Sequence, residues 1–369
     1  MLDLSRRALL VGSGAAAVTS TLAAFGKQPA MPPVRMVKVN GITLAVHEAG
    51  AGPAIVLLHG FPGLAFTWRH QIPALAAAGY RVIVPDLRGY GQSDTPPAVE
   101  DYDIAHLTGD LVSLLDVLNV EKAVFMGHDW GGLLAWQMPL LHEDRVAGVI
   151  GVNTPFIPHW MLWLHPDLVA AVSPGKRRFV ADPKVDPISQ MRNLYSANMY
   201  VLLFQDGRRA DEAMNREPRG SLRNSYRKNL MTSAEWNTLS PEVANMEYYG
   251  QPLPKEFPGR DVLNAQELDY YVRHFERTGF TPGINWYRNL SRNWRTGLDV
   301  DQTIRVPALM VSGAHDVVLR PSMTDKMDAH VKDLEKHVVA DCWHWTPEEK
   351  PEELNRLAIS WLGRRFPAK

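Results

Sequence analysis

The sequence has a single cysteine, Cys342, among its 369 residues. A disulfide within the chain needs two thiols, so none can form even in an oxidising compartment. Cys342 lies two residues before His344, but it follows an apolar strand that we expect to be buried, so a packed thiol is the favoured interpretation over a nucleophile. Folds that depend on disulfides are therefore excluded.

The sequence also has almost no net charge. Lys and Arg together number 39 and Asp and Glu 40, which gives a formal charge of -1. Nucleic acids and anionic membrane surfaces attract chains with a basic excess, so neither is an expected partner. Beyond the first 25 residues no stretch is long and apolar enough to span a bilayer, so we expect no membrane span after the N-terminal segment.

Residues 1–33 are similar to an export signal followed by a linker. Arg6 and Arg7 precede a mildly apolar stretch without charges that runs to Phe25, which is typical of a bacterial twin-arginine signal. Residues 21–23 and 24–26 are candidate cleavage sites. The alternatives are an uncleaved membrane anchor and an ordinary amphipathic first helix. We predict an exported, periplasmic protein.

The rest of the chain predicts one α/β core that is divided by an insertion. Apolar strands alternate with helices in the first core part (34–157) and again in the second (298–369), which predicts a mostly parallel sheet flanked by helices. Between them, residues 158–297 lose this alternation and predict a mainly helical cap. The expected elements are a hairpin with a type I′ turn over 34–47, strands over 54–58, 81–85, 123–128, 146–152, 308–312 and 336–340, and helices over 68–78, 104–118, 322–331 and 351–362.

The motif Gly-His-Asp-Trp-Gly-Gly at residues 127–132 joins a strand to a helix through a sharp turn. Such a turn needs small neighbours, because its central residue is strained and projects its side chain above the sheet. That residue is Asp129, where the common G-x-S-x-G motif has serine, so an ordinary serine esterase is excluded. A carboxylate is ionised at neutral pH and attacks an sp3 carbon without a base, which gives an alkyl ester that water must cleave.

Two further candidate groups follow the last two predicted strands. Asp316 comes just after the strand over 308–312, and His344 just after the strand over 336–340. The order nucleophile, acid, histidine is that of α/β-hydrolases, and the carboxyl ends of parallel strands meet at one edge of a sheet. The alternative for each residue is an ordinary surface or hydrogen-bonded position.

A metal or organic cofactor is not expected. His59 and His128 flank the predicted site, but neither belongs to a cluster with metal-ligand spacing, so we expect both to support neighbouring residues.

Five motifs in this order resemble those of soluble-type epoxide hydrolases with the α/β-hydrolase fold. The resemblance covers residues 39–362 and is weakest over 158–196, in the early cap. The motifs are His-Gly-Phe-Pro at 59–62, Gly-His-Asp-Trp-Gly-Gly at 127–132, Asn-Thr-Pro-Phe-Ile-Pro at 153–158, Gly-Ile-Asn-Trp-Tyr-Arg-Asn at 283–289 and Asp-Cys-Trp-His-Trp at 341–345.

The resemblance implies a reaction in two steps. Asp129 opens the epoxide, and two cap tyrosines stabilise the alkoxide that develops. Tyr287 matches one of these tyrosines and Tyr200 is our choice for the other; simple packing is the alternative for each. His344, oriented by Asp316, then activates water to cleave the ester and release a vicinal diol.

The same resemblance implies which backbone groups hold the oxyanion of the second step. They are the N–H groups of Phe61 and Trp130, with Gly60 allowing close approach of the loop and Pro62 in cis. Eleven tryptophans, several of them near the motifs, favour a lipophilic epoxide as the small-molecule partner.

Two classes of dehalogenase are rivals to this interpretation. Haloalkane dehalogenases share an elbow with Asp followed by Trp, but they place Asn where this chain has Phe61 and they lack the paired cap tyrosines. Haloacetate dehalogenases usually carry Arg where this chain has Trp130. The third possibility is a non-catalytic binding module, although such relatives usually lose a triad member and here every role is filled.

Overall fold

The computed structural model describes residues 31–173, 178–228, 235, 249 and 259–368. The predicted export signal lies outside these residues, except for the last three residues of its linker. Within the described part of the chain, no helix has the length and apolar character that crossing a bilayer requires.

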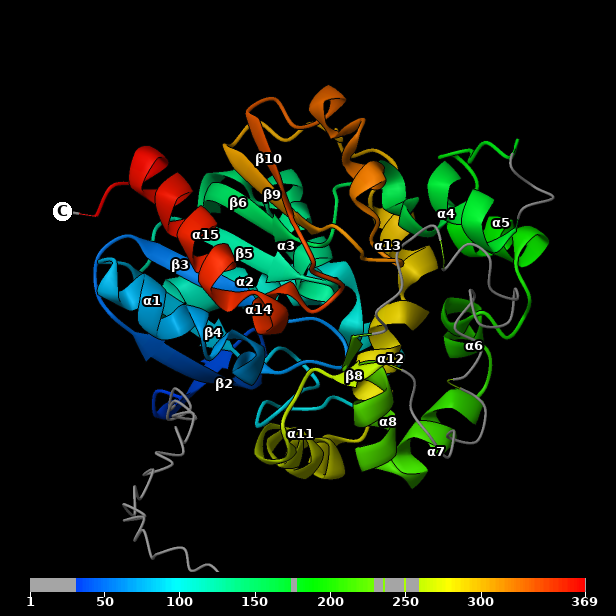
Figure 1. The fold of residues 1–369 in the computed structure, drawn as a ribbon, viewed down its shortest axis with the longest axis horizontal. Helices are drawn as coiled ribbons and strands as arrows, with labels where there is room; N and C mark the ends of the chain where they lie inside the picture. The colour runs from blue at the N-terminus through cyan, green and yellow to red at the C-terminus, as the bar shows by residue number, and fades with distance from the viewer. Residues whose placement is uncertain (1–30, 174–177, 229–234, 236–248, 250–258, 369) are drawn as a thin grey trace, which may run out of the picture.

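An eight-stranded sheet forms the core, in the order β1-β2-β4-β3-β5-β6-β9-β10 (Figure 1). β1 pairs antiparallel with β2, β2 pairs antiparallel with β4, and the remaining neighbours are parallel. Asn40 and Gly41 both have positive φ, 38° and 79°, so the predicted type I′ hairpin is confirmed. The strands are Val34–Val39 (β1), Ile42–Ala49 (β2), Ala54–Leu58 (β3), Arg81–Pro85 (β4), Ala123–His128 (β5), Val146–Val152 (β6), Ala308–Gly313 (β9) and Leu334–Val339 (β10).

Helices cover both faces of this sheet. Side chains alternate along a strand, so Ile55 and Leu57 of β3 pack in one apolar cluster and Val56 and Leu58 in another. The first cluster includes residues of α1 (Gln71–Ala77) and α15 (Pro351–Arg365), and the second includes residues of α2 (Ile104–Val117) and α3 (Trp130–Leu141). A strand that is apolar on both faces is typical of a parallel sheet between helices, and the predicted mostly parallel sheet flanked by helices is confirmed.

One predicted helix is wrong. Residues 322–331 form two short 3-10 turns, Pro321–Thr324 and Met327–Ala329, instead of one α-helix. Met323, Met327 and Val331 are buried at a helical spacing, which explains the prediction. The backbone winds more tightly than an α-helix here, because the N–H groups of Met323, Asp325, Ala329 and His330 each bond to the carbonyl three residues earlier.

Between β6 and β9 the chain forms a layer of helices beside the carboxyl ends of the parallel strands (Figure 1). It also contains a two-residue antiparallel ribbon, Arg227–Lys228 (β7) with Arg260–Asp261 (β8), which was not predicted because two residues carry no periodic pattern. The α-helices are Pro166–Val172 (α4), Pro187–Leu194 (α5), Tyr200–Gln205 (α6), Arg209–Arg216 (α7), Pro218–Ser225 (α8), Ala265–Thr278 (α11), Thr281–Arg288 (α12) and Leu290–Thr296 (α13).

A buried ion cluster fixes this layer to the core. The Arg69 guanidinium lies 2.7 Å from Glu267 of α11 and 2.5 Å from Glu348 of the core helix Thr346–Glu349 (α14). Tyr271 of α11 adds a hydrogen bond to Thr67 at 2.9 Å. Removing one partner from such a buried cluster leaves a charge uncompensated, so the contact holds the helical layer in one position over the sheet.

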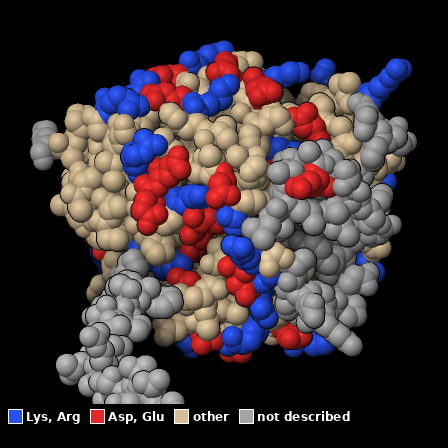
Figure 2. All heavy atoms as spheres, in the orientation of Figure 1, with Lys and Arg blue, Asp and Glu red and all other residues tan. Residues whose placement is uncertain are grey.

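Acidic and basic side chains are interspersed on the face that Figure 2 shows. Several acidic and basic side chains of the described residues form surface pairs, such as Arg365 with Asp333 at 2.8 Å. On this face, mixed charges agree with the near-zero net charge of the chain.

Candidate active site

The turn after β5 has the strained geometry that the sequence predicts. Asp129 has φ 53° and ψ −123°, directly before the first residue of α3. A Cβ on Gly127 would lie 2.0 Å from the Gly131 carbonyl oxygen, and a Cβ on Gly131 would lie 2.1 Å from the Leu58 carbonyl oxygen. Only glycine permits this approach of strand and helix, and the result is that the Asp129 side chain projects from the carboxyl end of the sheet.

Backbone N–H groups face the Asp129 carboxylate. Phe61 N–H donates to Oδ1 at 2.7 Å, and a Cβ on Gly60 would lie only 2.3 Å from the same oxygen. The Phe61-Pro62 peptide is cis, as predicted. Burial raises the pKa of Asp129, while the positive charge of His344 and hydrogen bonds from the Phe61 and Trp130 N–H groups oppose that rise. The Phe61 N–H thus holds Oδ1 of the carboxylate, and an N–H in this position can stabilise negative charge on that oxygen.

The His344 imidazole lies between the two aspartates. Its Nδ1 is 2.9 Å from Asp316 Oδ2, and its Nε2 is 3.8 Å from Asp129 Oδ2. An ionised carboxylate only accepts, so Nδ1 carries the proton that Asp316 binds and Nε2 faces Asp129. Burial lowers the pKa of His344, but the charge of Asp316, its hydrogen bond and then the charge of Asp129 raise it to about 9.

Asp316 is fully buried and is held by several donors. Its Oδ1 accepts the N–H groups of Val318 and Leu319, both at 2.9 Å. Burial raises the pKa of Asp316, yet the charge and hydrogen bond of His344 with these N–H groups bring it below the usual value. Asp316 therefore stays ionised beside the imidazole.

Asn153 supports this arrangement and was given no role from the sequence. It follows β6, has φ 61°, and donates through Nδ2 to Asp316 Oδ2 at 2.8 Å and to the Trp343 carbonyl at 3.0 Å. The next residue, Thr154, donates to the Asp129 carbonyl at 2.8 Å. The signal that could have found them is position, because residues 153 and 154 follow a parallel strand at the same edge as Asp129 and Asp316.

Tyr200 and Tyr287 come together from two helices of the layer. Their ring centroids are 5.9 Å apart at an angle of 78°. Tyr287 also contacts Phe61 at 5.6 Å and Trp130 at 4.9 Å. Gln205 at the end of α6 donates to the Tyr287 carbonyl of α12 at 2.8 Å, which joins the two helices. Burial raises the pKa of both phenols, so both keep their protons.

His59, His128 and Cys342 are supporting residues. Burial lowers the pKa of His59 to about 4 and that of His128 to about 3, so both rings are neutral. His59 Nε2 accepts the Leu87 N–H at 3.0 Å, and His128 Nε2 lies 2.7 Å from the His344 carbonyl. Burial raises the pKa of Cys342 to about 12, which keeps it a thiol. The described residues include no cluster of three or more His, Cys, Asp or Glu suited to a metal ion.

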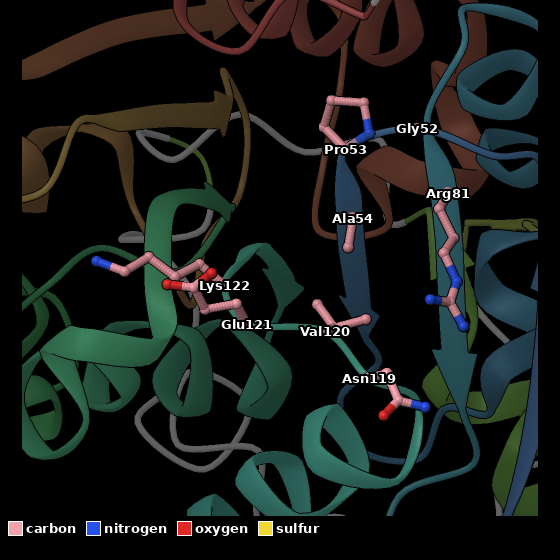
Figure 3. A pocket seen from close by; sticks show the side chains of 8 residues that line it. All are labelled: Gly52, Pro53, Ala54, Arg81, Asn119, Val120, Glu121 and Lys122. Atoms are coloured by element: carbon pink, nitrogen blue, oxygen red, sulfur yellow. The ribbon is translucent and has the colours of Figure 1, made fainter.

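A surface pocket at the opposite end of the sheet is separate from these groups. Figure 3 shows its lining side chains, which include Ala54 and Arg81 at the amino ends of β3 and β4 and residues 119–122 before β5. Catalytic groups of open α/β sheets collect at the carboxyl ends instead. This pocket therefore lies away from the candidate site.

The chain matches known proteins along most of its length. Residues 53–351 match the family model described as the alpha/beta hydrolase fold. Epoxide hydrolase A of Mycobacterium tuberculosis (strain ATCC 25618 / H37Rv) is 39% identical over 339 residues, which cover 90% of this chain and 97% of that protein. Bifunctional epoxide hydrolase 2 of Rattus norvegicus is 37% identical, and the match covers 87% of this chain but 54% of that longer protein.

Solved structures of epoxide hydrolases are also similar to this chain along most of its length. The crystal structure of epoxide hydrolase A from Mycobacterium thermoresistibile is 38% identical with a TM-score of 0.75, over 90% of this chain and 98% of that one. An epoxide hydrolase from an endophytic Streptomyces is 30% identical with a TM-score of 0.76, over 90% of this chain and 96% of that one.

Proposed function

The chain belongs to the α/β-hydrolase fold family as an epoxide hydrolase, and we propose that it converts a lipophilic epoxide to a vicinal diol through an alkyl ester on Asp129. The observation that carries this mechanism is the position of the Asp129 carboxylate, with His344 Nε2 at 3.8 Å from Oδ2 and a backbone donor at 2.7 Å from Oδ1. One oxygen is held and the other remains available for attack.

In the first step Asp129 Oδ2 attacks an epoxide carbon and the bond from that carbon to the ring oxygen breaks. The departing oxygen develops negative charge and takes a proton from a phenol, Tyr200 or Tyr287. Among the described residues, no hydrogen bond is donated by either phenol, so both protons remain for the substrate. Donors fixed in a buried site cost no reorganisation when the charge develops.

In the second step, His344 is the base, and formation of the ester makes it a better one. Esterification removes the negative charge of Asp129, which is one of the charges that raise the pKa of His344 to about 9, so the neutral imidazole becomes more available. His344 takes a proton from water, and the water oxygen attacks the ester carbonyl carbon. The oxyanion forms on Oδ1, which the Phe61 N–H holds and which the Trp130 N–H is proposed to stabilise as well.

The ester bond then breaks and the diol is released. His344 returns its proton to the departing alkoxide, which completes the diol. The second proton of the attacking water restores the phenol, and Asp129 is again a carboxylate. Asp316 stays ionised throughout and holds the imidazole by its Nδ1–H.

Aromatic rings around Asp129 support a lipophilic substrate. Trp130 contacts Trp163 at 6.0 Å and Tyr287 at 4.9 Å, and Phe61 contacts Phe204 at 5.8 Å. Rings with few polar atoms favour apolar surface over hydrated groups. We further propose that residues 158–297 act together as a cap that supplies most of this surface.

Turnover on two matched panels, epoxides and haloalkanes with the same aryl or alkyl groups, tests the function. We expect diol from the epoxides and no halide release. The rival dehalogenase function has one observation in its favour, because Trp130 Nε1 is buried and no described residue accepts its hydrogen bond. Halide release without diol would therefore replace the proposal with a function in which that indole holds halide.

We also propose that residues 1–33 direct export through a twin-arginine pathway, on the strength of Arg6, Arg7 and the uncharged stretch that follows. Fractionation of cells that produce the full chain should place it in the periplasm, and Arg6→Lys with Arg7→Lys should retain it in the cytoplasm. Equal periplasmic amounts of both forms would contradict the proposal.

A further inference from the structure

One cap residue binds a proposed catalytic phenol and has no role in the mechanism above. Trp163 Nε1 donates a hydrogen bond to Tyr200 Oη at 2.8 Å. An indole N–H can only donate, so the direction of this bond is fixed and the Tyr200 oxygen is the acceptor. The Tyr200 proton is therefore directed to another partner, and none is found among the described residues.

Trp163 is held rigidly in this position. It lies in the short 3-10 turn Leu162–Leu164, with 4% of its surface exposed. Its carbonyl accepts the Tyr195 hydroxyl at 2.6 Å, and its ring packs against Trp130 at 6.0 Å and Tyr287 at 6.3 Å. The indole thus lies between the nucleophile turn and both phenols. A donor that is already ordered loses little entropy when charge develops on its acceptor.

The two phenols therefore differ in their surroundings. Burial is the main cause that raises the pKa of each, but for Tyr200 the Trp163 hydrogen bond acts in the opposite direction. Tyr287 has no such donor among the described residues, and the charge of Asp129 and the neighbouring tyrosines add to the effect of burial. A hydrogen bond to a phenolate is charge-assisted and about twice as strong as one to a neutral phenol.

We infer that Trp163 is a positioning residue for ring opening, which makes Tyr200 the phenol that transfers its proton to the epoxide oxygen while Tyr287 donates a hydrogen bond. The indole N–H stabilises the phenolate that Tyr200 becomes when its O–H bond breaks and the alkoxide gains the proton. This inference rests on the proposed function. The residue lies in the part of the chain, 158–196, that resembles the family motifs least, which is why no sequence motif indicated it.

The test is a double-mutant cycle between Trp163→Phe and each tyrosine. The readout is the rate of ester formation in a single turnover with excess enzyme, together with the rate of ester hydrolysis. Trp163→Phe should slow ester formation about tenfold, the loss expected for one hydrogen bond to a group that becomes charged. Hydrolysis should be unchanged, because the Tyr200 phenolate and its bond from Trp163 are present both in the ester and in the transition state of its hydrolysis, so the bond does not change that barrier.

The cycle separates a positioning role from simple packing. In the Tyr200→Phe background, Trp163→Phe should cause no further loss of ester formation, whereas in the Tyr287→Phe background it should still cost about tenfold. An equal loss in both backgrounds, or no loss in the unmodified enzyme, would overturn the inference. If Phe at 163 prevents folding, benzothienylalanine at that position keeps the shape of the indole without its N–H and carries the same expectations.

Trp294→Phe is the matched control. Trp294 of α13 is also a buried cap tryptophan, and its Nε1 donates to the Pro183 carbonyl at 2.9 Å, away from the phenols. Its loss should reduce thermal stability about as much as Trp163→Phe and leave ester formation unchanged. If the unmodified enzyme forms no diol, the proposed function fails; if it forms diol and the cycle is additive, only the role of Trp163 fails.

Discussion

His344→Gln is expected to trap the enzyme as an ester on Asp129 and to reduce diol turnover by at least about 10⁴-fold. In the proposed mechanism different residues serve the two steps, because an ionised Asp129 carboxylate needs no base to attack, whereas water does. Gln has nearly the size of His but accepts no proton from water at neutral pH. Ester formation should therefore continue, and the ester should persist.

Intact mass spectrometry after exposure to an epoxide should show one added substrate mass, and peptide mapping should locate it at Asp129. His142→Gln is the control, since His142 is a half-buried histidine whose Nε2 lies 3.1 Å from Thr108 Oγ1, away from the site. It should turn over normally and carry no adduct. Normal turnover by His344→Gln, or inactivity with no adduct, would contradict the division of roles.

The sequence predicted those parts of the fold that local chemistry determines. The turn at Asn40 and Gly41 needs positive φ at both residues, and the turn at Asp129 needs glycine where backbones approach within about van der Waals contact, so both leave a recognisable local pattern. The convergence of Asp316 and His344 on Asp129 was predictable because all three follow parallel strands.

Contacts between distant segments without a pattern were not predictable. Trp163 and Tyr200 are 37 residues apart, and nothing in either segment indicates that one indole meets one phenol. Asn153 was visible as part of a motif, but its bond to Asp316 depends on how β6 and the loop after β9 lie in space. The 3-10 turns at residues 321–329 are the converse case, because a helical spacing of apolar residues is present there and the backbone nevertheless forms i to i+3 hydrogen bonds.

Tyr287→Phe is expected to slow ester formation about 100-fold, the loss typical of one fixed donor to a developing oxyanion, without destabilising the fold. The ring would keep its contacts with Phe204 at 5.0 Å and Trp130 at 4.9 Å. No hydrogen bond joins this hydroxyl to a described residue, so removing it breaks none of the hydrogen bonds within that part of the chain. Stopped-flow or rapid-quench measurement of a single turnover should show slow ester formation followed by hydrolysis at the normal rate.

Tyr102→Phe is the control for Tyr287→Phe. Tyr102 is fully buried, and its hydroxyl donates a hydrogen bond to the Pro96 carbonyl at 2.6 Å. That variant should lose about 1 kcal/mol of unfolding free energy and form the ester at the normal rate. If the Tyr287 hydroxyl served folding, Tyr287→Phe would behave like Tyr102→Phe, with lower stability and unchanged ester formation. A phenol retained for chemistry gives the reverse, because the energy of its hydrogen bond is realised only when the epoxide oxygen acquires charge.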